Sequence, residues 1–134
     1  MGSIVVGFVD SAEGDAALSA GIHEAARRGE RLIVVHSLRG GARTDDDEYL
    51  KAREALARVQ ERLEADDVDH EIHEYVRGNS PARDLIEATH DFGADLLVIG
   101  TRRRSSTGKL LLGSNALEIL HDADVPVLCV KPGT

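Results

Sequence analysis

The 134-residue chain contains no tryptophan, one cysteine and only 3% aromatic residues. The lone Cys129 cannot form an internal disulfide, which fits a reducing, cytoplasmic compartment. A net charge of −8 and the scarcity of stacking side chains argue against nucleic-acid binding. No apolar run approaches the roughly 18 residues of a membrane span, and the apolar start at Ile4 has no basic leader, so neither a membrane anchor nor a signal peptide is expected.

Apolar segments of strand length alternate with segments of helical periodicity along the chain. Strands are expected at Ser3–Asp10, Leu32–Leu38, His70–Val76, Leu96–Ile99 and Pro126–Lys131. Helices are expected at Asp15–Arg28, from a Thr44 N-cap to Leu63, from a Ser80 N-cap to Phe92, and at Ser114–His121. This alternation requires a parallel sheet with right-handed crossovers and helices on both faces. A single α/β domain over residues 1–134, with an open, doubly wound five-stranded sheet, is therefore predicted.

Two strand ends carry residues that suit a ligand site. In an open parallel sheet, ligands bind beyond the carboxyl ends of the strands, where the winding direction reverses. Asp10 closes the first predicted strand and Gly100 the fourth, so their loops share one crevice if these strands are neighbours. Further along, Gly113 allows close approach of a ligand, and the helix start at Ser114 and Asn115 offers unpaired N–H groups to phosphate oxygens. The alternative is an ordinary turn and helix cap.

The densest positive patch of this acidic chain is the run Arg102-Arg103-Arg104, which favours an anionic ligand over the alternative of a solvated loop. The nearby Ser106-Thr107-Gly108-Lys109 does not complete a Walker-type phosphate loop. Arg103 stands where that motif needs glycine, and Leu110 stands where it needs serine or threonine. No metal site is expected elsewhere, because His70 and His73 would point to opposite faces of a strand.

The segment GTRRRSSTGKLLLGSNA, followed by LEILHDADVPVLCVK, resembles the universal stress protein family. The nucleotide-binding branch of that family has glycine, two residues, glycine, nine residues, glycine and then serine or threonine. Gly100, Gly113 and Ser114 hold the first and last of these places, whereas Arg103 replaces the second glycine and makes this a variant with an RRRS loop. The resemblance covers essentially the whole chain. It implies an adenine nucleotide alpha hydrolase-like fold with strand order 3-2-1-4-5.

The resemblance also implies a ligand, ATP with Mg²⁺ on its phosphates, and a homodimer. Asp10 and the backbone near Ser37 would contact the ribose and adenine, and Gly100 would line the ribose and phosphates. The phosphates would lie at the helix start, where an arginine could place a guanidinium on them. The implied site residues are Asp10, Ser37, Gly100, Arg102, Arg103, Gly113, Ser114 and Asn115. The last strand would pair across a twofold axis, with Val127, Cys129 and Lys131 near the interface.

Three functions remain open from the sequence. The first is a nucleotide-responsive stress or signalling module. The second is a dimeric interaction protein of the same fold without a nucleotide, which Arg103 in place of glycine favours. The third is a slow ATPase in which Asp10 ligates Mg²⁺ and Arg103 steadies the phosphate charge. Because no residue is identified to orient the attacking water, turnover is expected to be absent or very slow.

Overall fold

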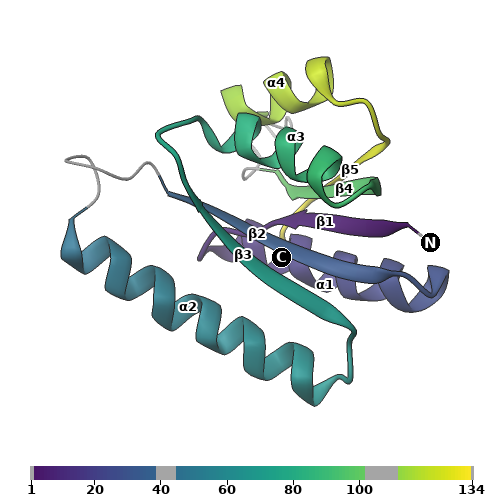
Figure 1. Ribbon diagram of the computed structural model, residues 1–134, viewed down its shortest axis with the longest axis horizontal. Helices are drawn as coiled ribbons and strands as arrows, with labels where there is room; N and C mark the ends of the chain where they lie inside the picture. Colours follow the sequence, from purple (N-terminus) through teal and green to yellow (C-terminus); the bar gives the residue numbers. More distant parts are fainter. Residues whose placement is uncertain (1, 39–44, 102–111, 134) are drawn as a thin grey trace.

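The computed structural model describes residues 2–38, 45–101 and 112–133, which form one parallel sheet between two pairs of helices (Figure 1). The elements in chain order are β1 (Ser3–Gly7), α1 (Ala12–Arg28), β2 (Arg31–Leu38), α2 (Asp46–Ala65), β3 (His70–Val76), α3 (Pro81–Asp91), β4 (Ala94–Gly100), α4 (Ser114–Asp122) and β5 (Val127–Val130). The five strands lie in the order β3-β2-β1-β4-β5 and every neighbouring pair is parallel. The predicted fold class and strand order are confirmed.

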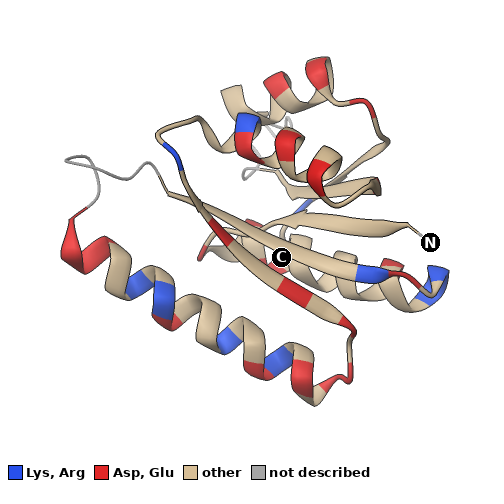
Figure 2. Cartoon of the chain, in the orientation of Figure 1, with Lys and Arg blue, Asp and Glu red and all other residues tan. Residues whose placement is uncertain are grey.

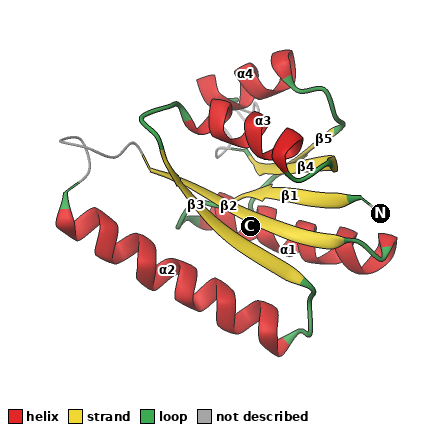
Figure 3. Ribbon diagram, viewed as in Figure 1, coloured by secondary structure: helices red, strands yellow, loops and turns green. Residues whose placement is uncertain are grey.

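The central strands are buried on both faces, which explains why they are nearly continuous apolar runs. Successive side chains of β1 point to opposite faces, so Ile4 and Val6 pack on the side of α1 and α2, and Val5 packs on the side of α3 and α4. Figure 3 shows these two helix pairs on opposite sides of the sheet. The described residues contain no helix that is both long and apolar enough to cross a membrane.

The winding direction reverses between β1 and β4, which are neighbours in the sheet. The chain leaves β1 through α1 on one face, whereas α4, which precedes β5, lies on the other face (Figure 1). The predicted adjacency of the first and fourth strands is confirmed. The carboxyl ends of β1 and β4 therefore flank the position where open α/β sheets bind ligands.

Side-chain caps move several element boundaries away from the sequence prediction. β1 ends at Gly7 instead of Asp10, and α1 begins at Ala12 instead of Asp15, because the Ser11 hydroxyl accepts the N–H of Gly14 at 3.2 Å and starts the helix early.

The predicted Thr44 cap of α2 is also corrected. The residue in the N-cap position is Asp45, whose carboxylate accepts the N–H of Glu48 at 2.8 Å. A carboxylate is favoured there by the positive end of the helix dipole as well as by this hydrogen bond. Figure 2 shows the acidic residues that gather at this end of α2.

Candidate functional site

A small hollow lies at the carboxyl ends of β1, β2 and β4, beside the starts of α3 and α4. Its volume is about 170 Å³, and Val35, Leu85 and Ile99, which belong to the core on the α3 and α4 side, supply apolar walls. Pockets that enclose a whole drug-sized ligand measure roughly 300–1,000 Å³. The hollow therefore suits one apolar ring system, with the rest of a ligand outside its mouth.

Because Gly100 has no side chain, the start of α1 packs directly against the carboxyl end of β4. A Cβ atom placed on Gly100 would lie 2.1 Å from the carbonyl oxygen of Glu13, which is backbone and has no freedom to swing away. Gly100 and Glu13 both line the hollow. Any side chain at Gly100 would therefore push α1 away from β4 and change the shape of the hollow.

Among the described residues, no side chain caps the first turn of helix α4, which begins at the hollow. Gly113 is its N-cap residue and makes no side-chain hydrogen bond, whereas α1, α2 and α3 each have a side-chain acceptor at this position. Ser114, the first residue of α4, is exposed. The orphan N–H groups and the positive end of the dipole make this helix start a ready place for phosphate oxygens.

The starts of α3 and α4 are tied together beside the hollow. The side-chain carbonyl oxygen of Asn115 accepts the backbone N–H of Ala82 at 3.3 Å, which leaves the Asn115 amide group free to donate. Pro81 and Asn115 both line the hollow. Two helix N-termini therefore approach the same opening, and their dipoles add to the attraction for a negative ligand.

Ser37 lies near the carboxyl end of β2, beside the first turn of α3. Its hydroxyl donates to Oδ2 of Asp84, a residue of α3 that is fully buried. Ser37 itself lines the hollow, so Asp84 acts on any ligand through this hydroxyl.

His36, the neighbour of Ser37, faces the other side of the sheet and is also buried. Desolvation by burial lowers the pKa of His36, and the charges of Glu74 and Asp10 oppose that shift. Its Nδ1 lies 3.8 Å from Glu74 Oε2, and neither atom has a hydrogen-bond partner among the described residues. This arrangement holds a neutral imidazole in the core and supplies no acid–base group to the hollow.

The structure brings some of the sequence-predicted site residues together and separates one. Ser37, Gly100 and Asn115 line the hollow, and Gly113 and Ser114 begin the helix that borders it. The Asp10 carboxylate instead lies 3.3 Å from Arg58 Nη2 of α2, in a separate hollow of about 150 Å³. Arg102 and Arg103 lie outside the described residues.

Sequence reasoning missed the apolar walls of the hollow and the buried Asp84. The walls carried a usable signal, because Val35 and Ile99 lie near the carboxyl ends of buried strands, where a ligand was already expected. Asp84 carried none, because the chain contains many acidic residues on predicted helices and nothing local marks this one as buried.

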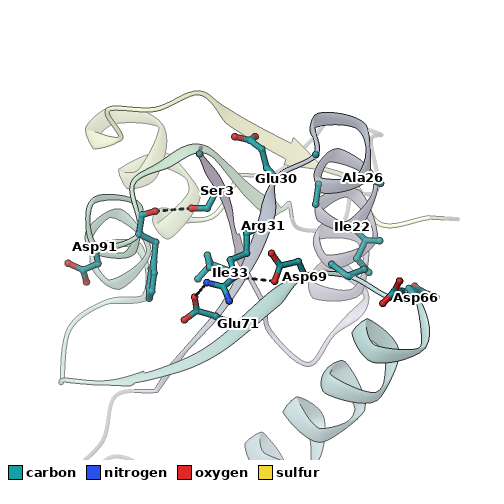
Figure 4. Close-up of a pocket in the computed structure, with 16 residues that line it drawn as sticks. Ser3, Ile22, Ala26, Glu30, Arg31, Ile33, Asp66, Asp69, Glu71 and Asp91 are labelled. Atoms are coloured by element: carbon teal, nitrogen blue, oxygen red, sulfur yellow. Dashed lines mark hydrogen bonds and ion pairs between the residues drawn. The ribbon is translucent and has the colours of Figure 1, made fainter.

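A second and larger hollow lies at the other end of the sheet, around the amino ends of β1 and β2 (Figure 4). It measures about 770 Å³ and is lined by the carboxylates of Glu30, Asp66, Asp67, Asp69, Glu71 and Asp91. Arg31 is the one lysine or arginine among the described residues that line it. Its Nε lies 3.3 Å from Asp69 Oδ1, and its Nη1 lies 2.5 Å from Glu71 Oε2 (Figure 4). This surplus of negative charge repels phosphates.

No group of three or more histidine, cysteine, aspartate or glutamate side chains within residues 2–38, 45–101 and 112–133 is arranged to hold a metal ion. The exposed Asp10 carboxylate is already paired with Arg58.

Comparison with known proteins gives a consistent result over the whole chain. The model of the Universal stress protein family matches residues 1–131. A universal stress protein of Mycolicibacterium smegmatis is 40% identical over 133 residues, which cover 96% of this chain and 97% of that protein. The solved universal stress protein from Archaeoglobus fulgidus in complex with dAMP is 33% identical, with a TM-score of 0.80 over 98% of both chains. A universal stress protein in complex with cAMP is 27% identical, with a TM-score of 0.72 over 98% of both chains.

Proposed function

The chain belongs to the universal stress protein family, and we propose that within it this chain is a cytoplasmic, adenine-nucleotide-binding stress-response or signalling module. The observation that carries the proposal is the apolar hollow at the reversal of the sheet, with the uncapped start of α4 at its edge. Relatives of the same fold that hold dAMP and cAMP support an adenine nucleotide as the ligand. ATP, with Mg²⁺ carried on its phosphates, is the proposed physiological ligand.

In this proposal each part of the nucleotide meets a surface of matching chemistry. The purine lies between the apolar walls of Val35, Leu85 and Ile99, where burial of its faces is favourable. The ribose passes Gly100, and the phosphates reach the N–H groups at the start of α4. A hydrogen bond to a charged oxygen contributes roughly 1.5–3 kcal/mol, so three of them together with the buried base support about micromolar affinity.

The helix start is tested by Ser114→Ala and Gly113→Ala, with ATP affinity measured by calorimetry. Gly113 has a φ of −73°, which any residue adopts, so alanine there keeps the fold and removes only the room for a phosphate. Each change is expected to weaken binding about tenfold or more, Ser114→Ala through the loss of one charge-assisted hydrogen bond and Gly113→Ala because its methyl group takes up space that the phosphate needs. Ser19→Ala, at an exposed serine of α1, is the matched control and should leave affinity unchanged. Unaltered affinity in both site variants would remove this site.

The proposed homodimer pairs β5 with a second copy of itself. Among the described strands, β5 has a neighbour only on its β4 side. The carbonyls of Pro126 and Val130 accept hydrogen bonds from β4, so by strand alternation the N–H groups of Val127 and Cys129 point to the open edge, and Lys131 follows in the same phase.

The dimer is tested by sedimentation of Cys129→Pro, which removes one outward N–H and no bond to β4. The variant should sediment as a monomer, while Cys129→Ala, which keeps the N–H, should remain dimeric. A dimer in both variants would place the interface elsewhere.

A further inference from the structure

The side chains of Ser37 and Asp84 form a buried polar pair directly behind the small hollow. Asp84 is fully buried, and its Oδ2 accepts the hydroxyl hydrogen of Ser37. Its other oxygen, Oδ1, is buried without a hydrogen-bond partner among the described residues. A buried carboxylate oxygen without a hydrogen-bond partner costs folding free energy, so the position of Asp84 beside the small hollow needs a physical explanation.

Helix capping does not supply that reason. The first turn of α3 already has its acceptors, because Ser80 Oγ accepts the N–H of Arg83 at 3.2 Å and Asn115 accepts the N–H of Ala82. The N–H of Asp84 is bonded within the helix to the carbonyl of Ser80. The Asp84 side chain thus makes no capping hydrogen bond, although its charge is favourable in the first turn of α3, and its one hydrogen-bond partner among the described residues is Ser37.

The pair fixes the direction of the hydrogen bond that Ser37 can offer to a ligand. A serine hydroxyl has one hydrogen and two lone pairs, whereas a carboxylate only accepts. Because Asp84 holds the single hydrogen, the lone pairs of Ser37 Oγ are what remain for the hollow that Ser37 lines. The apolar side chains of Val35 and Leu85 lie beside it, whereas the free amide of Asn115 lines the hollow at the start of α4. At Ser37 the hollow therefore presents an acceptor and no donor.

We infer that Ser37, held in this orientation by Asp84, selects a purine with an exocyclic amine and rejects one with a carbonyl at the same place. An amine donates to the free lone pair of Ser37 Oγ, whereas a carbonyl oxygen would face it with no hydrogen between them. Ser37 is the contacting residue, and Asp84 is a positioning residue that acts through it. The inference rests on the proposed function, because it assigns the base end of the nucleotide site proposed above.

The test compares the affinities of AMP and IMP, which differ in having an amine or a carbonyl on the purine. The native protein should bind AMP about tenfold more tightly than IMP, the worth of one hydrogen bond replaced by an unfavourable contact. Equal affinities would overturn the selectivity and leave the nucleotide site standing. Failure of both nucleotides to bind would overturn the proposed function and this inference with it.

The positioning role is tested by Asp84→Asn, which keeps the shape of the side chain and adds a donor. The new amide can donate to Ser37 Oγ, so the hydroxyl hydrogen becomes free to point into the hollow and meet a carbonyl. The ratio of AMP to IMP affinity should fall about tenfold, to unity or below, which a purely structural role would not produce. An unchanged ratio in a folded variant would overturn the inference.

Two further variants keep the result decisive. Ser37→Ala removes the contacting hydroxyl and should also bring the ratio close to unity, so it decides the matter if Asp84→Asn melts before it can be measured. Asp91→Asn is the matched control on the same helix, where the carboxylate accepts the Tyr75 hydroxyl at 3.1 Å and lies outside the small hollow. Its ratio should equal that of the native protein. A shift as large as that of Asp84→Asn would mean that any loosening of α3 alters selectivity, and would overturn the inference.

Discussion

The carboxyl and amino ends of the sheet both carry a hollow, and the two differ in size and charge. The hollow at the amino ends is about 770 Å³ and rimmed by carboxylates, whereas the hollow at the carboxyl ends is about 170 Å³ with apolar walls and two helix N-termini beside it. In a parallel α/β fold each helix starts near the carboxyl end of the strand before it, so positive helix ends gather there. We therefore expect the polarity of the helices, and not the volume of a hollow, to decide where an anion binds in this molecule.

Alanine substitutions of one glycine at each end of the sheet are expected to show the largest difference in stability between the two ends. Gly100→Ala should lower the free energy of unfolding by about 2–3 kcal/mol, because its Cβ would meet the Glu13 backbone carbonyl, and it should weaken nucleotide binding. Gly2→Ala, at the amino end, meets only the flexible carboxylates of Glu30 and Asp95, and should cost less than about 0.5 kcal/mol. Denaturant midpoints of the two variants measure the difference. Equal losses would contradict the rigid packing assigned to the carboxyl end.

The two ends of the sheet should also differ, by a smaller amount, in how they make the stability of the fold depend on pH. A hydrogen bond with Asp95, together with desolvation, raises the pKa of Glu30 above 4.5 at the amino end, so this pair destabilises the fold at neutral pH. That penalty fades as pH falls through the raised pKa toward 4.5, where the unfolded chain also binds the proton. Desolvation lowers the pKa of His36 below 6.5 at the carboxyl end of β2. Its penalty is absent at neutral pH and grows as pH falls below 6.5, because only the unfolded chain then binds the proton.

Thermal melts between neutral pH and about pH 4.5 check these opposite slopes. Glu30→Gln should raise the melting temperature at neutral pH, and the gain should shrink as the solution is acidified. His36→Gln should have the opposite effect on the pH dependence of the melting temperature, because it should reduce the loss of stability on acidification. The same slope in both variants would contradict the assigned protonation states.

The fold could be predicted from the sequence because its determinants are local. The central strands are buried on both faces, and the helices between them carry one apolar stripe each, so the alternation is visible without tertiary information. The boundaries at Ser11 and Asp45 were missed because several neighbouring side chains can cap a helix, and only the folded backbone selects one of them.

The candidate site could be predicted only in part. The sequence predicts a close approach of a ligand at Gly100 and Gly113, and in the structure Gly100 lines the small hollow and Gly113 precedes the helix that begins beside it. The Asp10 side chain points away from the hollow because Arg58, far along the chain on α2, pairs with it. The Ser37–Asp84 hydrogen bond spans 47 residues. Such contacts depend on tertiary packing, which no local pattern encodes.

The central claim is that the nucleotide binds at the carboxyl end of the sheet and not in the larger acidic hollow. Titration of ¹⁵N-labelled protein with AMP, followed by amide chemical shifts, tests it most directly. The amides of Ser37, Gly100, Ser114 and Asn115 should shift together with one saturation curve, while those of Asp66 and Asp69 stay in place. Shifts concentrated around Asp66 and Asp69, with none at the start of α4, would contradict the account.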